Sequence, residues 1–315
     1  MAMGAAVDLG IAEEMRRDGR VIGLGTQPPA RLVDEFGRRR VRAMPISEAG
    51  FSGAAVGAAA AGLRPIVFWR NVTFSFVAFD TVINQASKLR YMFDGQRNFP
   101  IVFVATCGAG FRLGAQHSQS PYSIFAHVAG IKVLLPTTAA EAKGLVKSAI
   151  RDDGPVIVLL PTRLEASEGP VGGENETVPI GLARIRRAGT DVTIVALGYM
   201  IELALAAADR AAELGVSAEV IDPRSVSPLD AGSVLASVRR TGRLIVVDEA
   251  PPMCSMASEV TALVAEDGET FASLRAPVQR VCGAAVPIPY SPALEDAVLP
   301  SVDGILKAIR SVVTR

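Results

Sequence analysis

The chain alternates short apolar runs with longer helical patterns, and this alternation restricts its fold more than any other feature. Runs of four to eight residues rich in Val and Ile recur at residues 21–25, 64–69, 100–106, 131–136 and 155–161. Stretches with helical patterns separate them, at residues 6–18, 50–62, 76–92 and 138–151. Runs that are apolar throughout are typical of strands buried on both faces, as in a parallel sheet covered by helices. The first half is therefore predicted to be an α/β domain with a parallel sheet.

A second alternation follows residues 165–180, a segment that gathers Gly, Pro and Glu without apolar periodicity. Such a composition is typical of a linker between domains. Beyond it, strands are expected at residues 190–198, 217–223, 243–250 and 278–283, and helices at residues 201–215, 230–240, 255–266 and 301–313. Because 315 residues are enough for two hydrophobic cores, we expect two α/β domains with parallel sheets, at residues 1–178 and 179–315.

Composition disfavours several classes of protein. Lys plus Arg and Asp plus Glu number 32 each, so there is no basic excess to neutralise the phosphates of a nucleic acid. The sequence has no apolar run of the ~18 residues that a membrane helix needs, and no membrane partner is expected. The three cysteines are scattered without C-x-x-C spacing, and Glu13, Glu14 and Asp18 argue against a transit peptide. We therefore expect a soluble protein of the reducing cytoplasm.

Several common catalytic motifs do not occur in the sequence. The chain has two histidines, His117 and His127, too few for a multi-histidine metal cluster. The glycines of GAGFRLG at 108–114 are spaced one residue too widely for the dinucleotide fingerprint and lead into a polar stretch. Neither a phosphate loop of the type G-x-x-x-x-G-K-[ST] nor a G-x-S-x-G elbow is found. Dinucleotide-dependent and hydrolase chemistry are therefore disfavoured.

A carboxylate, Glu48, lies in the apolar stretch PISEAGFSGAA at residues 45–55. An acid in such surroundings is expected to hold or donate a proton near neutrality. The alternative is a helix start, in which Ser47 caps the Gly/Ala-rich helix that follows and Glu48 lies in its first turn. The residues alone leave both interpretations open.

Two further segments follow predicted strands, where parallel-sheet proteins usually bind their ligands. NVTFSFVAFD at 71–80 is dense in aromatic residues, and most of Phe74, Phe76 and Phe79 are expected to lie in the core. GAQHSQSPYSIFAH at 114–127 is polar and holds both imidazoles. A histidine there is more often structural than catalytic, although loops after parallel strands carry many sites.

These segments in combination resemble a known family. The first half contributes PISEAGFSGAAVGAAAAGLRPIVF, FVAFDTVINQASKLRYMFDGQ and the run from GAQHSQS to DDGPVI, and the second half AEVIDPRSVSPLD, LIVVDEAP and VPIPYSPALEDAVLPS. They resemble the beta subunit of thiamine-diphosphate-dependent 2-oxoacid dehydrogenases of the pyruvate, branched-chain and acetoin types, and look most like the acetoin dehydrogenase branch. The resemblance implies two doubly wound domains, a transketolase-like pyrimidine-binding domain followed by a transketolase C-terminal-like domain.

The resemblance also implies roles for the residues singled out above. Glu48 matches the family glutamate that hydrogen-bonds the aminopyrimidine ring of thiamine diphosphate. Phe74 matches the aromatic residue that stacks on that ring, and Ile46 matches part of the same pocket wall. His117 matches the active-site histidine that steers protons during acyl transfer to a lipoyl arm. His127 is expected to be structural.

Ions and partners are implied as well. The backbone carbonyls of Ile101, Ala149, Ile150 and Asp152 match a potassium site, although the segment KSAIRDD could equally be a plain helix end. The family holds the diphosphate and its magnesium through a G-D-G motif and a later Asn, and that motif does not occur here. An alpha subunit is therefore expected to supply this half of the site in an alpha2-beta2 heterotetramer. A lipoyl acyltransferase core is a further expected partner.

The implied function is that of an oxidoreductase subunit. We expect a 2-oxoacid or acetoin dehydrogenase that is active only with its alpha subunit and transfers an acyl group to lipoamide. The alternative is half of a two-component, transketolase-like ketol transferase or acyloin synthase without a lipoyl complex. Departures from the family pattern favour an altered substrate: the loop after Gly25 is shortened, and Phe68, Trp69 and Arg70 replace an acid and smaller residues. Arg70 is expected either to bind a substrate carboxylate or to lie on the surface.

Overall fold

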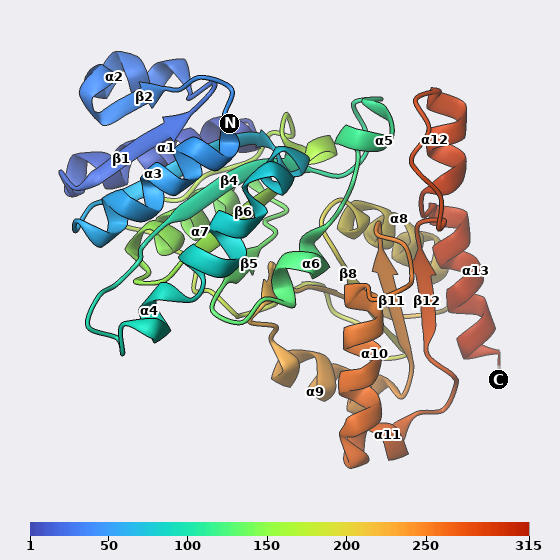
Figure 1. Ribbon diagram of the computed structural model, residues 1–315. Coiled ribbons are helices and arrows are strands. Elements are labelled where there is room, and N and C mark those ends of the chain that lie inside the picture. The colour runs from blue at the N-terminus through green and yellow to red at the C-terminus, as the bar shows by residue number, and fades with distance from the viewer. Residues whose placement is uncertain (315) are drawn as a thin grey trace. The chain divides into compact units, whose positions relative to one another are not determined.

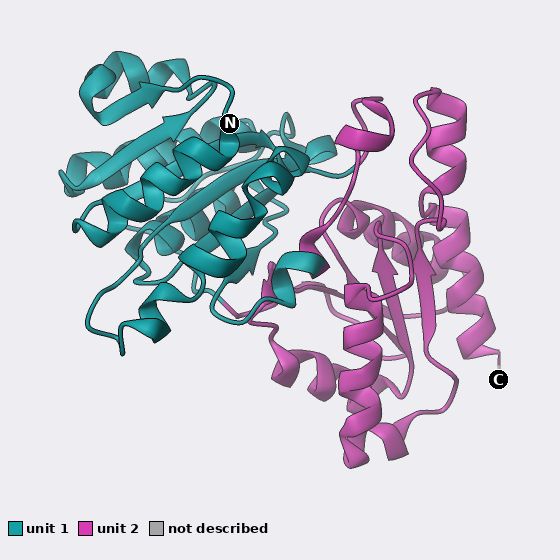
Figure 2. Ribbon diagram, viewed as in Figure 1, with its two compact units in different colours: residues 1–108, 124–180 teal, residues 109–123, 181–315 magenta. Residues whose placement is uncertain are grey.

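The computed structural model describes residues 1–314 and divides into two compact units (Figure 2). Unit 1 comprises Met1–Gly108 and Ile124–Ile180, and unit 2 comprises Ala109–Ser123 together with the chain from Gly181 onward. The domains predicted at residues 1–178 and 179–315 are continuous, whereas the structure groups residues 109–123 with the second unit. That division into domains stays a prediction, and the inserted segment is the feature that the sequence did not indicate.

Unit 1 is built on a parallel sheet whose strands follow the order β5-β6-β4-β3-β1-β2 (Figure 1). The strands are β1 (Val21–Gly25), β2 (Val41–Ala43), β3 (Arg64–Asn71), β4 (Val102–Cys107), β5 (Lys132–Leu134) and β6 (Val156–Pro161). All except β2 coincide with apolar runs, because they are covered on both faces. Gly25 is required on β1, since a Cβ there would lie 2.6 Å from Phe68 O. The parallel sheet predicted for the first half is confirmed.

Helices connect the strands of unit 1. They are α1 (Met3–Arg17), α2 (Ala30–Arg40), α3 (Glu48–Ala60), α4 (Leu89–Met92) and α7 (Ala139–Arg151), with the short 3-10 helix η3 (Thr162–Leu164). The helices predicted at 6–18, 50–62 and 138–151 are confirmed with small shifts of their ends. No helix described between residues 1 and 314 is both long and apolar enough to cross a bilayer.

The single helix predicted at residues 76–92 is wrong. The chain forms the 3-10 helix η1 (Val72–Ala78) and the π-helical turn η2 (Thr81–Ala86) before α4. Asn71 starts η1 by accepting a hydrogen bond from Thr73 N at 3.0 Å. The buried residues of η1, Val72, Ser75 and Ala78, recur every three positions, which is the period of a 3-10 helix rather than an α-helix.

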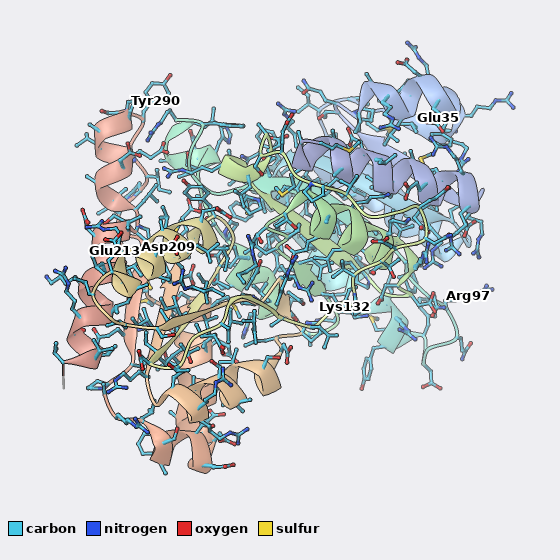
Figure 3. The ribbon with its side chains drawn as sticks, turned by 180° about the vertical axis from the view of Figure 1, so that it is seen from behind. Glu35, Arg97, Lys132, Asp209, Glu213 and Tyr290 are labelled. Carbon is cyan, nitrogen blue, oxygen red and sulfur yellow. The ribbon has the colours of Figure 1, made fainter. Side chains whose placement is uncertain are left out.

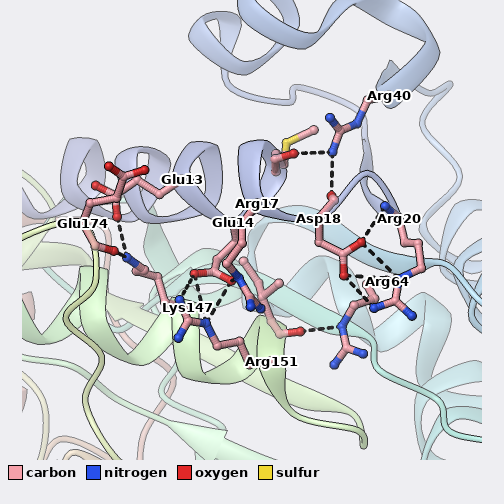
Figure 4. Close-up of polar contacts among 12 residues, drawn as sticks. Glu13, Glu14, Arg17, Asp18, Arg20, Arg40, Arg64, Lys147, Arg151 and Glu174 are labelled. Carbon is pink, nitrogen blue, oxygen red and sulfur yellow. Dashed lines mark hydrogen bonds and ion pairs between the residues drawn. The ribbon is translucent and has the colours of Figure 1, made fainter.

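Helices α1 and α7 pack together through buried ion pairs (Figure 4). Glu13 of α1 accepts from Lys143 Nζ at 2.7 Å and from Lys147 Nζ at 2.6 Å, and both lysines are buried. One position on, Glu14 pairs with Arg151 at 2.6 Å. Charges that are buried in this way need partners of opposite sign, which is why the pairs face each other across the two helices.

The predicted linker at residues 165–180 is irregular but fixed to unit 1. At its start, Gly4 N donates to Glu165 O at 2.9 Å and Met3 N to Ser167 O at 3.0 Å. In its middle, the carbonyls of residues 172–174 accept from Lys143 and Lys147. Near its end, Ser148 Oγ donates to Val178 O at 2.6 Å. We call residues 165–178 the strap.

Unit 2 contains a mixed sheet in the order β12-β11-β8-β9-β7. Its strands are β7 (Arg184–Arg187), β8 (Val192–Ala196), β9 (Ala218–Asp222), β11 (Leu244–Asp248) and β12 (Gln279–Cys282), and the chain also forms the short β10 (Ser225–Ser227). The four strands predicted for this half pair in parallel, and β7, which was not predicted, runs antiparallel to β9 at one edge. The sequence RIRR of β7 is charged, as suits an edge strand, so it lacks the apolar run of a central strand.

Helices cover both faces of this second sheet. They are α8 (Met200–Ala212), α9 (Ala231–Thr241), α10 (Met256–Glu266) and α13 (Val302–Val313); unit 2 also contains α11 (Gly268–Ser273) and α12 (Pro292–Val298). Ile194 packs in one apolar cluster with residues of α8 and α13, whereas its neighbour Val195 packs in another with residues of α9 and α10. Successive strand residues face opposite sides, so unit 2 is doubly wound as predicted.

Candidate functional site

Glu48 begins helix α3, a few residues after the carboxyl end of β2. Ser47 occupies the N-cap position, but its side chain makes no capping hydrogen bond. Glu48 is only 8% exposed, and within residues 1–314 its carboxylate has neither a hydrogen bond nor an ion pair. The Glu48 oxygens are not among the fully buried, unpartnered side-chain atoms of residues 1–314, so they reach the surface and are available to a ligand.

Helix α3 is held in place by a tryptophan that the sequence marked only as a departure from the family. Trp69 of β3 is fully buried, and its indole Nε1 donates to Ser52 Oγ of α3 at 3.0 Å. The indole ring also stacks on Phe103 of β4, with ring centroids 4.4 Å apart. Because Ser52 lies one helical turn after Glu48, this bond fixes the turn that carries the carboxylate.

Phe74 lies on η1, directly after the carboxyl end of β3, and is half-buried. Helix α3 packs against η1, so unit 1 brings the elements of Glu48 and Phe74 together. Ile46, two residues before Glu48, is 88% exposed. The three residues predicted to hold a pyrimidine ring therefore follow the carboxyl ends of β2 and β3, the edge where parallel sheets bind ligands.

Arg70 stands at the end of β3 in a conformation that arginine rarely adopts. Its φ is +66°, and the pairing of β3 with β4 shifts register between Phe68 and Arg70. Thr106 Oγ1 donates to the Arg70 carbonyl at 2.8 Å and holds the backbone there. Such bulges re-aim side chains beside functional sites, and Arg70 is exposed four residues before Phe74.

His117 is carried by unit 2, on the one-turn helix α5 (Gly114–His117) within the inserted segment 109–123. The segment is anchored at its start by backbone donors: Ala109 N to Glu249 Oε1 at 2.6 Å, and Gly110 N to Glu295 Oε1 at 2.8 Å. His117 is half-buried. His127 is exposed and lies in unit 1, after the short α6 (Tyr122–Ala126), so the two imidazoles fall in different units.

The end of the same segment is anchored by Tyr122 and Asp248. Tyr122 donates its hydroxyl to Asp248 Oδ1, and both side chains are buried. Asp248 also accepts from Ala250 N at 2.9 Å and from Ala257 N at 3.2 Å. Burial raises the pKa of the Asp248 carboxyl, although these hydrogen bonds act in the opposite direction.

The four residues predicted to bind potassium lie around the C-terminal end of α7. Asp152 is the C-cap, and Phe99 N donates to Asp153 O at 3.1 Å, which brings the start of β4 alongside. The carbonyls of Ile150 and Asp152 accept from the Arg64 guanidinium at 2.8 and 2.5 Å. The Ile101 carbonyl accepts from Val156 N at 2.9 Å, and that of Ala149 from Asp152 N at 3.2 Å.

These contacts test how well the carbonyls fit a cation. A carbonyl has two lone pairs, so each oxygen can accept a hydrogen bond and still coordinate an ion. However, Arg64 already brings one positive charge to this helix end, and Lys132 pairs with the Asp152 side chain. A potassium ion would therefore share its ligands with a guanidinium. Among residues 1–314 no group of three His, Cys, Asp or Glu side chains is placed to hold a metal.

A cavity of about 510 Å³ opens elsewhere in unit 1. Its lining residues are Ser87, Arg90, Tyr91, Gly95, Gly130, Ile131, Lys132, Gly154 and Pro155. Lys132, labelled in Figure 3, lies on β5 and contributes a positive charge to the wall. None of the residues predicted to contact the cofactor lines this cavity, so it is separate from the edge that carries Glu48 and Phe74.

Comparisons with known proteins give this architecture a class. Residues 1–166 match the family model described as the transketolase pyrimidine-binding domain, and residues 181–305 match the transketolase C-terminal domain. A split-gene transketolase, solved as an inactive beta4 tetramer, superposes with a TM-score of 0.82 over 100% of this chain and 98% of its own, at 23% identity. The fold is therefore that of a transketolase-type protein, as predicted.

Curated relatives narrow the class to a family. The beta subunit of the acetoin:2,6-dichlorophenolindophenol oxidoreductase of Bacillus subtilis (strain 168) is 45% identical over 306 residues, covering 97% of this chain and 87% of the relative. The mitochondrial pyruvate dehydrogenase E1 component subunit beta-1 of Arabidopsis thaliana is 43% identical over 321 residues, covering 98% and 88%. The chain belongs to the family of transketolase-type beta subunits that contains these two proteins, which confirms the predicted resemblance.

Glu48, Phe74 and His117 stay predictions as site residues, and sequence reasoning missed the residues that hold the elements of Glu48 and His117 in place. Trp69 and Ser52 fix the helix of Glu48, whereas Tyr122 and Asp248 fix the segment of His117. A signal for Asp248 was present, because the carboxylates of LIVVDEA directly follow an apolar run and so lie at the end of a buried strand. However, nothing in the sequence indicated that Asp248 and Glu249 accept hydrogen bonds from residues 109–123, more than a hundred residues earlier.

Proposed function

We propose that this chain is the beta subunit of a thiamine-diphosphate-dependent 2-oxoacid or acetoin dehydrogenase, active only together with an alpha subunit. The observation that carries the proposal is the place of Glu48: a largely covered residue, with oxygens that have no hydrogen-bond partner within residues 1–314 and reach the surface, at the ligand-binding edge of a pyrimidine-binding domain. The names of the two relatives, which are beta subunits of an oxidoreductase and of a dehydrogenase, support an oxidation as the class of reaction. They do not separate the two substrate classes.

The residues of this chain have distinct tasks in the proposed reaction. Thiamine diphosphate, when bound, supplies a nucleophilic thiazolium carbon. Glu48 holds a proton at the pyrimidine ring nitrogen, and its position at the start of α3 leaves its oxygens open to that ring. Phe74 and Ile46 offer apolar surface on which a flat ring can stack. His117 moves protons during acyl transfer to lipoamide, the proposed acceptor.

The partner and the ions are part of the same proposal. An alpha subunit supplies the diphosphate half of the site with its magnesium, in an alpha2-beta2 heterotetramer. This is supported by the word beta in the names of the relatives and by the missing G-D-G motif. A lipoyl acyltransferase core accepts the acyl group. A potassium ion at the carbonyls of Ile101, Ala149, Ile150 and Asp152 has a structural role. The location is the cytoplasm, where reduced cysteines such as those of this chain are the rule.

The proposal is tested by coexpressing the chain with its alpha-type subunit, to be sought in the neighbouring reading frames, and replacing Glu48 by Gln. Glu48→Gln should keep assembly and lose activity by about 10²–10⁴-fold, the range of general acid–base catalysis. The matched control is Glu213→Gln, at an exposed position after α8. Unchanged turnover in Glu48→Gln would contradict the proposal, and so would tight binding of thiamine diphosphate by this chain alone. Product release without any lipoyl protein would favour the ketol transferase or acyloin synthase instead.

A further inference from the structure

The segment 109–123 is fixed to unit 2 at both ends, and the proposed function does not by itself require this. At the first end, two backbone N–H groups donate to carboxylates whose own side chains are buried, Glu249 and Glu295. Arg112 adds a pair with Asp296 at 2.9 Å. Backbone N–H groups held by buried carboxylates have little freedom, because charge-assisted hydrogen bonds are short and strong.

At the second end, a side-chain hydrogen bond joins Tyr122 to Asp248. Tyr122 is 2% exposed, lies five residues after His117 and donates to Asp248, which is 0% exposed. Asp248 itself cannot shift easily, because Ala250 N and Ala257 N also donate to it. Ala257 lies in the first turn of α10, whose dipole favours a negative charge at this place. Asp248 is thus a fixed point at the end of β11.

Apolar packing alone would hold the segment with less energetic cost. A buried carboxylate must be desolvated, and replacing such polar contacts with apolar groups is often neutral or stabilising. Burial indeed raises the pKa of Asp248. A buried Tyr–Asp contact therefore suggests a need for a defined geometry rather than for stability. Between the anchored start of the segment and Tyr122 lies His117, a half-buried side chain that is capable of acid–base chemistry.

We propose that Asp248 is a positioning residue for His117 and acts through the hydroxyl of Tyr122. This inference rests on the proposed function, because it assigns His117 a proton-transfer step. Asp248 fixes Tyr122, Tyr122 fixes the end of the segment, and Glu249 and Glu295 fix its start. The imidazole is then held at one place, as proton transfer demands, since small displacements of a catalytic group cost large factors in rate.

The test uses the assembled alpha–beta complex with Tyr122→Phe, which removes one oxygen and leaves the ring to fill its buried site. We expect kcat to fall about 10-fold while KM changes little, and the pH profile of kcat to change. In a His117→Ala background the same substitution should cost nothing further, because both changes act on one step. Tyr91→Phe, at an exposed position of α4, is the matched control.

A second readout does not depend on turnover. With histidine labelled only in this chain, NMR should give two imidazole signals, because the sequence has two histidines. Tyr122→Phe should shift or broaden the His117 signal; the exposed His127, which also lies five residues from Tyr122 but outside the segment 109–123, is the internal reference, and a change confined to the His127 signal would overturn the positioning role. Asp248→Asn should act like Tyr122→Phe and add nothing to it; if Asp248→Asn fails to assemble, the Tyr122→Phe result decides.

The outcomes separate this inference from the proposed function. Wild-type kcat and pH profile in Tyr122→Phe would overturn the positioning role, and so would an equal loss with and without His117. Exchange of the thiazolium C2 proton, followed by NMR, should depend on Glu48 and be unaffected by Tyr122→Phe. If Glu48→Gln leaves that exchange unchanged in the complex, the proposed function fails, whatever Tyr122 does.

Discussion

Replacing Asp8 by Asn should stabilise unit 1, and the gain should grow with pH. Asp8 lies half-buried on α1, and burial raises its pKa from the ordinary 3.8 to about 6. The nearby Arg31 opposes this rise, and Glu165 of the strap adds to it. The folded chain therefore holds this proton more tightly than the unfolded chain does, and it must ionise the carboxylate at a cost as pH rises through about 6.

The size of the effect follows from the two pKa values. Below about pH 4 the carboxyl is protonated in both states, so Asn should change the free energy of unfolding little. Above about pH 7 it is ionised in both, and the full shift corresponds to about 3 kcal/mol. Because the site is partly open to solvent, we expect a gain of about 1–3 kcal/mol for Asp8→Asn at pH 8.

Urea unfolding of the purified chain measures this directly. Trp69 is the single tryptophan and is buried in unit 1, so its fluorescence reports on the unit that contains Asp8. The control is Asp34→Asn, at an exposed position of α2. Equal stabilisation at pH 4 and at pH 8, or a loss of stability at pH 8, would refute the reasoning, since neither fits a carboxyl with a raised pKa.

Two further predictions concern the ion pairs and the carbonyls of unit 1. Lys147→Met should destabilise unit 1 by about 1.5–3 kcal/mol in the same assay, because Glu13 would lose one of its two buried partners and keep Lys143; Lys307→Met, exposed on α13, should change little. If potassium binds beside Arg64, the melting temperature in KCl should exceed that in choline chloride of equal strength by roughly 2–4 °C at a tenfold excess over Kd. Identical melting temperatures would leave Arg64 as the sole cation at those carbonyls.

Local patterns predicted what depends on local burial. The runs at 64–69 and 155–161 became β3 and β6 because both faces of those strands are covered, and an apolar run records that directly. Glu48 could be placed at a helix start because Ser, an acid and small residues follow one another there. These features need only the neighbours along the chain.

Features that depend on distant partners could not be predicted. Residues 109–123 group with unit 2 because Asp248, Glu249 and Glu295 accept their hydrogen bonds, and no spacing in the sequence indicates those pairs. β7 runs antiparallel because of its pairing with β9. The charged sequence RIRR does not indicate that orientation. Ile46 and Tyr290 are both exposed (Figure 3 labels Tyr290), and local composition does not distinguish a large side chain on the surface from one in the core.

The strap has the composition of a flexible linker, yet it contributes to the structure of unit 1. Residues 165–178 are rich in Gly, Pro and Glu, and an engineer would be tempted to lengthen them or exchange them for a Gly/Ser spacer. Their carbonyls, however, are the acceptors for Lys143 and Lys147, two ammonium groups buried between α1 and α7. A Gly/Ser spacer of the same length also has carbonyls, but as a flexible coil it would not hold them at the two ammonium groups. Insertions, fusions and protease sites therefore belong elsewhere in this chain.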